Sequence, residues 1–439
     1  MGEESVEFIL PPWEAEALIE NLKPSSLDDI GTKKWFEYHQ KLMLLHQQSI
    51  LEISTLREEA IKECFVNFQK IPILIYEAIQ ISLWKEKVFP VMIGANGEPS
   101  NTFMLYSVFY HESIVVSLLE NVLFHSDSVE TLEDSALDLI DYSVGNLTDL
   151  IFSKEEFQAS LPENATCLEE LIFKRGEMEF DIAMKSISIL AYLAGFAESL
   201  PLAVVKRLLS THDVPYLMTM LIENRPWRKI NGEGVDMIYM SSWEKVKENE
   251  RDKICKIEGQ IWIGLRELLL NPKCAPYYPI NEFRIAELSK LQKHLHERVL
   301  DQIAPLIDLR RWLGYLTLSP PGNTSNPPIS VEIIPQIRSS ILEKYKKKWK
   351  RIAKSQGELF YNNDINHVKS YAEILSAAYD VDKMVATVAR HCALCSEIAT
   401  KKCSKCKSIW YCGRECQVKD WPGHKNKCEE ISKSEGNMD

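Results

Sequence analysis

Eight potential zinc ligands crowd into the C-terminal part of this 439-residue chain. They follow the order Cys-x2-Cys-x7-Cys-x2-Cys-x5-Cys-x3-Cys-x7-His-x3-Cys and are Cys392, Cys395, Cys403, Cys406, Cys412, Cys416, His424 and Cys428. A two-residue gap lets both thiolates of a pair turn onto one metal ion, and a three-residue gap places two ligands on one helical face. Eight ligands complete two tetrahedral zinc sites. Because no coordination position remains for water, we expect structural zinc and not hydrolytic zinc.

Neither scattered buried thiols nor disulfide bonds suit these cysteines as well as zinc does. Seven of the chain's 11 cysteines fall between residues 392 and 428, which argues against scattered buried thiols. A disulfide framework needs an oxidising compartment, but the first residues begin no apolar secretory segment and no stretch is long and apolar enough to span a membrane. We therefore expect reduced thiols and no membrane span. Cys64, Cys167, Cys255 and Cys274 are predicted to be ordinary buried or half-buried thiols.

The charge balance argues against a nucleic-acid partner. The chain carries 51 Lys and Arg against 63 Asp and Glu, a net charge of −12, so it repels polyanions as a whole. The zinc segment alone has nine basic and five acidic residues, or +4, but seven thiolates add −7 and two zinc ions add +4, which leaves about +1. Its basic residues therefore mostly balance its own metal clusters.

The region before the cysteines reads as successive helices. From about residue 13 to 318, apolar residues recur at helical spacing between short polar or Pro/Gly breaks, as at Leu42, Leu45 and Ile50. Pro72 and Pro215 each stand near a helix start before an apolar stretch, which is typical of armadillo-type repeats. The expected fold class is all-α: an armadillo-like helical-repeat body at 1–318 followed by a small two-zinc finger. A generic helical bundle is the alternative.

Breaks in composition divide the rest of the chain. Residues 225–251 mix glycines and charges and are predicted to form a long loop. The segment 319–331 is a proline-rich linker, because its four prolines and one glycine before residue 329 cannot continue a helix. Residues 332–390 form a helical connector, with one amphipathic helix over 334–352 that carries Lys346, Lys347 and Lys348 on a solvated face, and a second over 367–388. The finger follows at 391–428 and a flexible tail at 429–439.

No catalytic motif accompanies this organisation. Fingers of this type occur inside lysine methyltransferases, but the Asn-His-x-Cys motif of their SET domain is missing: Val368 and Lys369 follow Asn366-His367, and Asn271-Pro-Lys-Cys274 lacks the histidine. There is no glycine-rich dinucleotide fingerprint after a strand, no phosphate-binding loop and no nucleophile elbow. We therefore predict a protein that is not an enzyme.

A peptide-binding role suits the finger better. Gln417 and Trp421 are four residues apart just after Cys416, so they project from one helical face, where an indole and an amide could hold a short peptide. The alternative is that Trp421 packs against the zinc cluster, as Trp410 and Tyr411 are expected to do.

As a whole, the cysteine-rich segment, with its WYCGREC run at 410–416, resembles a MYND zinc finger. The resemblance implies interleaved binding of two Zn²⁺ ions. Cys392, Cys395, Cys412 and Cys416 would hold zinc 1, and Cys403, Cys406, His424 and Cys428 would hold zinc 2. In MYND fingers that capture proline-rich peptides, the contact positions match Ser404, Gln417 and Trp421 here.

The body is similar to one family of MYND-finger proteins. The similarity lies in WKEKVFP (84–90), ALDLIDY (136–142), LSTHDVPYL (209–217) and QIWIGL (260–265). It implies a cytoplasmic factor that acts in the preassembly of outer and inner axonemal dynein arms, with centriolar satellites or the basal-body region as further locations. The implied partners are a leucine-rich-repeat assembly factor, chaperones and co-chaperones, and dynein chains. The alternative function is a nuclear co-repressor adaptor that recruits proline-rich motifs through its finger.

Overall fold

The structure is a computed structural model. It describes residues 8–55, 58–152, 161–162, 164–318, 333–362, 364–388, 392–395, 399, 401–403, 405 and 409–435. The predicted linker 319–331 lies outside these ranges. In the part described, no helix is both long enough and apolar enough to cross a membrane.

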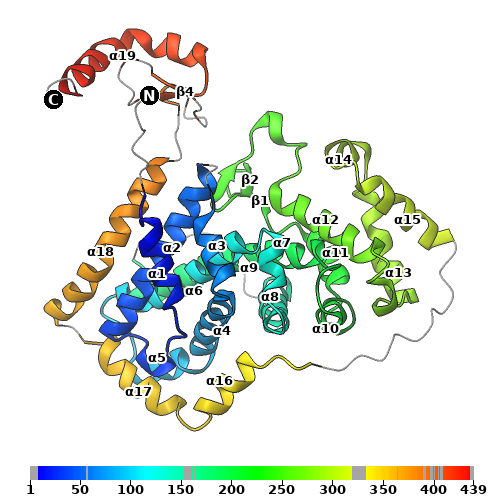
Figure 1. Cartoon of the computed structure of the whole chain (residues 1–439), viewed down its shortest axis with the longest axis horizontal. Coiled ribbons are helices and arrows are strands. Elements are labelled where there is room, and N and C mark those ends of the chain that lie inside the picture. The colour runs from blue at the N-terminus through cyan, green and yellow to red at the C-terminus, as the bar shows by residue number, and fades with distance from the viewer. Residues whose placement is uncertain are drawn as a thin grey trace.

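The body is an array of α-helices around one continuous hydrophobic core (Figure 1). Its helices are α1 (Pro12–Glu20), α2 (Lys33–Ser54), α3 (Ala60–Asn67), α4 (Ile71–Lys87), α5 (Phe89–Asn96), α6 (Phe103–Val122), α7 (Ser126–Glu130), α8 (Ser135–Phe152), α9 (Cys167–Gly195), α10 (Leu202–Lys206), α11 (Val214–Asn224), α12 (Lys256–Leu270), α13 (Glu282–Ser289), α14 (Glu297–Gln302) and α15 (Leu306–Leu318). The 29-residue helix α9 packs against α6, α8 and α12, and α6 packs in turn against α2 and α4. The prediction of a mostly helical body is confirmed.

Local sequence signals set several helix starts. Thr166 and Glu169 form a capping box that opens α9, in which each side chain accepts a hydrogen bond from the other residue's backbone N–H. Pro72 and Pro215 lie in the first turns of α4 and α11, where a missing N–H costs nothing. Both proline-marked helix starts are therefore where the sequence predicts them.

The predicted loop at 225–251 is wrong in part, because it contains a three-stranded antiparallel sheet. The strands are β1 (Arg228–Ile230), β2 (Asp236–Tyr239) and β3 (Trp243–Lys245) in the order β1-β2-β3, with Lys229 opposite Met237 and Ile238 opposite Glu244. The rings of Tyr239 and Trp243 pack on Phe180 of α9 at centroid distances of 4.9 and 5.4 Å. Strands of three or four residues are too short to show alternation, and this tertiary aromatic contact fixes them. The chain is mostly helical and not all-α.

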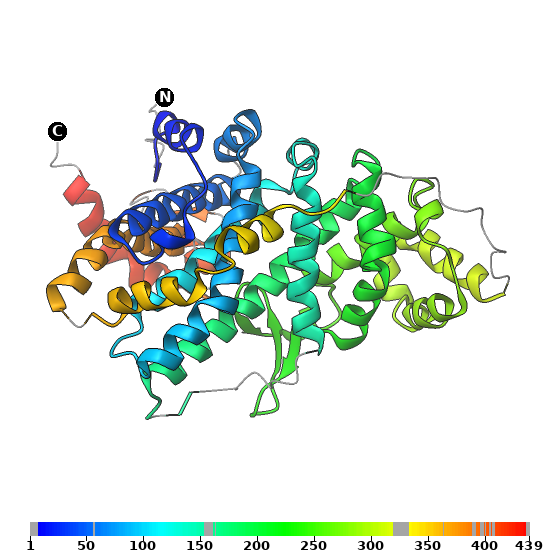
Figure 2. The same ribbon diagram turned by 90° about the horizontal axis from the view of Figure 1, so that it is seen from below.

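Residues 333–388 form a strap that crosses the N-terminal half of the body (Figure 2). The strap consists of α16 (Ile337–Tyr345), α17 (Trp349–Phe360) and α18 (Ile365–Val388), which pack on α4, α5 and α2 respectively. The second predicted connector helix is confirmed in α18. The single helix predicted over 334–352 is wrong, because a turn at 346–348 divides it. Tyr345 before the turn and Ile352 after it are both fully buried.

Hydrogen bonds as well as apolar contacts attach the strap. Trp84 Nε1 of α4 donates to Gln356 Oε1 at 2.7 Å, and Gln356 Nε2 donates to the Leu27 carbonyl at 2.8 Å. Farther along, Gln47 Nε2 of α2 donates to the Ala378 carbonyl at 2.9 Å. Because these groups are buried, breaking a pair leaves polar atoms without water. The strap is thus part of the core of the N-terminal half.

Replacing Asp138 by alanine is expected to loosen the start of the strap. Its buried carboxylate accepts hydrogen bonds from the backbone N–H groups of Ile337 at 2.8 Å and Gln336 at 3.1 Å, and so caps α16 from α8. Loss of such a cap costs about 1–2 kcal/mol. Urea unfolding followed by circular dichroism measures this change. Asp149→Ala, at an exposed position on the same helix, is the control and should stay within about 0.5 kcal/mol of wild type.

Candidate metal centre

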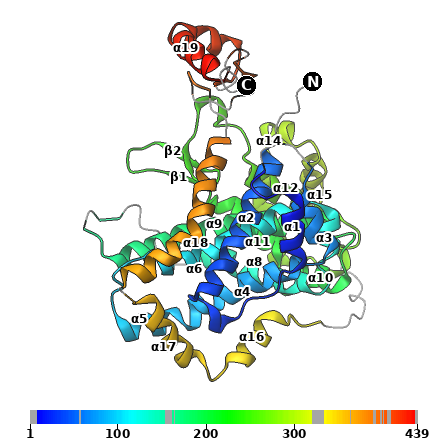
Figure 3. The same ribbon diagram turned by 60° about the vertical axis from the view of Figure 1, so that its left-hand side comes forward.

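The finger is a small two-stranded ribbon followed by a helix (Figures 1 and 3). Strands β4 (Lys401–Lys402) and β5 (Trp410–Tyr411) pair antiparallel, with Lys401 opposite Tyr411, and α19 covers Arg414–Glu435. The backbone N–H of Cys403 donates to the Ile409 carbonyl at 2.8 Å, which closes the ribbon beside its cysteines. Because α19 continues to Glu435, residues 429–435 of the predicted flexible tail are helical.

The first ligand group gathers Cys392 and Cys395 from the first knuckle with Cys412 and Cys416 from the end of β5 and the start of α19. Their sulfur atoms all lie within 4.8 Å of one another. Cys412 Sγ lies 3.5 Å from Cys395 Sγ and 3.4 Å from Cys416 Sγ. Four thiolates at about 2.3 Å from a tetrahedral zinc ion are about 3.8 Å apart, so this spacing fits one ion.

The second ligand group contains Cys403, His424 and Cys428. Their ligand atoms also lie within 4.8 Å of one another, all three residues are buried, and the two sulfurs are 3.8 Å apart. Cys406, the predicted fourth ligand, lies outside the described residues. The two groups alternate along the chain, in the interleaved manner that the resemblance implies. The finger thus has two Cys/His clusters suited to two zinc ions.

The pKa values of two thiols in the first ligand group indicate why this group needs a cation. Burial raises the pKa of the Cys392 thiol, but the backbone N–H groups of Cys412, Cys395 and Leu394 outweigh this effect and lower it to about 6. The Cys412 pKa is instead raised to about 12, chiefly by hydrogen bonds with the thiols of Cys416 and Cys395. Without a cation, ionisation of Cys392 is therefore favoured and that of Cys412 is disfavoured. A dication removes that penalty and stabilises all four thiolates together.

The first turns of α19 carry the predicted peptide contacts. Trp421 is 37% exposed, and its ring meets the His424 ring edge-on at a centroid distance of 5.8 Å. Gln417 is half-buried one turn earlier, and Ser404 lies outside the described residues. One edge of Trp421 therefore packs on the cluster, as the alternative interpretation expects, and the rest of the ring is open. Peptide binding by Ser404, Gln417 and Trp421 stays a prediction.

One supporting contact escapes sequence reasoning. The Tyr411 ring is fully buried, and its hydroxyl donates to Asp420 Oδ2 at 2.7 Å, which ties β5 to α19. Residues nine apart, one on a strand and one on a helix, share no periodicity that could reveal the pair. The only sequence signal is that an aromatic residue directly precedes Cys412.

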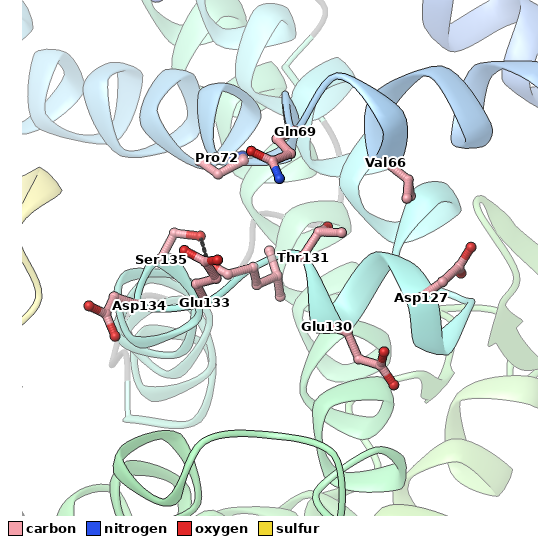
Figure 4. Close-up of a pocket in the computed structure, with 10 residues that line it drawn as sticks. Val66, Gln69, Pro72, Asp127, Glu130, Thr131, Glu133, Asp134 and Ser135 are labelled. Atoms are coloured by element: carbon pink, nitrogen blue, oxygen red, sulfur yellow. Dashed lines mark hydrogen bonds between the residues drawn. The ribbon is translucent and has the colours of Figure 1, made fainter.

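The surface of the helical body has an open groove of about 570 Å³ (Figure 4). Asp127, Glu130, Glu133 and Asp134 lie on one side of it, and Val66 and Pro72 lie across from them. Lys62 pairs with Asp127 at 2.9 Å. The residues that line the groove include carboxylates and hydroxyls but no histidine, lysine or cysteine. It therefore contains no Ser–His, Cys–His or Ser–Lys pair of the kind that activates a nucleophile in many hydrolases.

Some known proteins match this chain over the finger only, and another matches it over almost its whole length. Residues 392–428 match the MYND finger family. The zinc finger MYND domain-containing protein 10 homolog of Drosophila melanogaster is 35% identical over 446 residues, which cover 95% of this chain and 98% of that protein. No solved structure matches.

Enzymes match over the finger alone. Ubiquitin carboxyl-terminal hydrolase 19 of Arabidopsis thaliana is 51% identical over 49 residues, or 11% of this chain and 7% of its own. SET domain and MYND-type zinc finger protein 6 of Schizosaccharomyces pombe is 41% identical over 54 residues, or 12% of this chain and 11% of its own. The enzymatic parts of these proteins are therefore not what the chain resembles.

Proposed function

Because the chain belongs to the zinc finger MYND domain-containing protein 10 family, we propose that it is a non-catalytic scaffold for preassembly of outer and inner axonemal dynein arms. The observation that carries the proposal is the extent of the likeness, which includes the helical body as well as the finger. A titration with S-adenosylmethionine tests the enzymatic alternative that the finger suggests. Saturable binding of that cofactor would count against a scaffold.

The scaffold works by holding different partners on separate parts of one chain. The body and strap share one large apolar core, whereas the finger has a core of its own around Cys392, Cys403, Tyr411 and Cys428. Two separate cores let the finger bind a leucine-rich-repeat assembly factor while the body holds dynein chains near chaperones and co-chaperones. The proposed location is the cytoplasm, with centriolar satellites or the basal-body region of ciliated cells as further sites.

We also propose that the body is an armadillo-like repeat that ends near residue 318. The proline-marked starts of α4 and α11 and the stacking of α4, α6, α9 and α12 on one another support this architecture. Such stacking gives extended surfaces for large clients. The strap, predicted as a connector from 332 to 390, would then close the N-terminal half of the repeat and lead into the finger at 391.

Trp421→Ala is expected to remove the partner of the finger and leave the clients of the body bound. The exposed part of the indole is the largest open apolar side chain at the start of α19, and exposed aromatic residues of this kind dominate peptide binding. Affinity purification of wild type and variant, with zinc determined in each, measures the effect. Val418→Ala removes another exposed apolar side chain from the same helix and serves as the control. Loss of both partners from a folded, zinc-loaded variant would contradict the division of labour.

A further inference from the structure

The strap carries a dense run of positive charge. Residues 344–357 contain seven Lys and Arg and no Asp or Glu. Six of these cations, all exposed, form what we call the basic ridge: Lys346, Lys347, Lys348, Lys350, Arg351 and Lys354. The sequence predicts a solvated face for the first three only. The structure adds the other three from α17, directly after the turn at 346–348.

The fold holds these cations outward on one element. In α17, Ile352, Ala353, Gln356 and Phe360 face the core, so Lys350 and Lys354, four residues apart, share the opposite face. The turn that ends α16 is held by a hydrogen bond from the Lys348 N–H to the Tyr345 carbonyl at 2.8 Å. Because the strap is built into the core, the ridge is a fixed surface and not a loose charged tail.

Little negative charge balances the ridge locally. Arg351 lies 3.4 Å from Asp28 and Lys346 lies 3.4 Å from Glu343, and all four side chains are at least 44% exposed. Exposed pairs of this kind contribute about 0–1 kcal/mol. No carboxylate of the described residues lies within ion-pair distance of Lys347, Lys350 or Lys354.

The charge of the strap opposes that of the whole chain. Residues 337–360 hold eight cations and two carboxylates, a net +6, so the remaining residues carry −18 of the total of −12. An exposed helix face that only needs solvation commonly mixes both signs. A rigid patch of single sign on an oppositely charged protein instead favours encounter with a partner of complementary charge.

We propose that the basic ridge is a docking surface for a flexible protein segment rich in aspartate and glutamate. The ridge fits this partner better than other polyanions. Within the described helices α16 and α17 no large hydrophobic or aromatic side chain is exposed. Trp349, the aromatic residue between Lys348 and Lys350, is half-buried with its ring 5.9 Å from that of Tyr345, so no fully open ring is offered for stacking on bases or for insertion into a membrane. The −18 elsewhere on the chain repels an extended anionic surface, whereas a short acidic segment can bind the ridge alone.

The full chain, loaded with zinc, can be titrated against a fluorescent peptide of about 12 residues in which Glu and Asp alternate with Gly and Ser, followed by anisotropy. We expect binding that weakens as NaCl increases, since exposed charges are screened. Reversing Lys347, Lys350 and Lys354 together to Glu should weaken it by about tenfold or more. These side chains are exposed and outside the core, so helical content and zinc content should stay unchanged.

A matched variant removes the effect of overall charge. Lys245→Glu, Arg251→Glu and Lys253→Glu change the net charge equally at exposed positions, the first in strand β3 and the other two after the small sheet. This variant should bind as wild type does, and so should Lys347→Arg, Lys350→Arg and Lys354→Arg. Equal weakening in the sheet variant, or none in the ridge variant, would overturn the proposal. So would tighter ridge-dependent binding of a single-stranded RNA or of phosphatidylserine vesicles. Each of these binding results can be obtained whether or not the protein acts in dynein-arm preassembly, so the ridge proposal and the proposed function can fail separately.

Discussion

Replacing Cys403 by alanine is expected to lower the zinc content from two ions per chain to about one and to unfold the finger around the lost site. Cys403 is buried at the end of β4, and its sulfur lies 3.8 Å from that of Cys428 in the second ligand group. Metal binding supplies most of the folding free energy of such small modules, on the order of 10 kcal/mol per structural zinc site. Metal analysis together with limited proteolysis of the C-terminal region measures both effects.

The helical body should remain intact in this variant. The core of the finger and the core of the body contain no common residue, so loss of the finger removes no support from the body. Cys167→Ala is the control, because it removes a half-buried thiol that belongs to neither ligand group. It should retain both zinc ions. If Cys403→Ala also lost the helical circular dichroism of the body, the two parts could not be independent.

Trp84→Ala is expected to destabilise the body by about 3–5 kcal/mol, the usual cost of removing a buried tryptophan side chain. The indole is fully buried, with ring centroids 5.8 Å from Phe89, 6.1 Å from Phe109 and 6.0 Å from Phe360. Phe360 belongs to the strap, so the cavity would open between α4 and α17. Urea unfolding measures the loss, and hydrogen exchange should show α17 opening earlier than α9.

One further variant separates packing from hydrogen bonding at this contact, and another serves as the control for loss of an indole. Gln356→Leu keeps most of the buried volume but leaves the Trp84 N–H and the Leu27 carbonyl without their partner, at a cost of about 1–3 kcal/mol. Trp13→Ala changes an indole that is 71% exposed and should cost less than about 0.5 kcal/mol. A Trp84→Ala variant as stable as Trp13→Ala would mean that the strap does not complete the core.

The sequence predicts the parts of this protein that rest on local spacing. The two-residue gap pairs Cys392 with Cys395, because such a knuckle is a short-range turn, whereas the resemblance is what assigns Cys412 and Cys416 to the same ion. The structure places these four sulfurs together. The mostly helical character of the body follows from apolar periodicity, and Pro72 and Pro215 mark two helix starts. The resemblance, in turn, identifies the family through residues spread along the whole chain.

Long-range contacts explain what the sequence does not predict. The strap returns to the N-terminal half through pairs such as Trp84 with Gln356, which are 272 residues apart. Amphipathic periodicity shows that 334–352 has a buried face but not that a turn must divide it to fit α4 and α5. The small sheet likewise depends on Phe180 of α9, far from its strands in sequence.

The most direct test of a scaffold role is affinity purification of the intact protein from multiciliated cells, with bound proteins identified by mass spectrometry and zinc determined in the same sample. A scaffold for dynein-arm preassembly predicts dynein chains, chaperones and the leucine-rich-repeat factor, together with two zinc ions per chain. Chromatin co-repressors in place of dynein chains would contradict this role and favour a nuclear adaptor. Fewer than two zinc ions in the folded protein would contradict the assignment of the eight ligands.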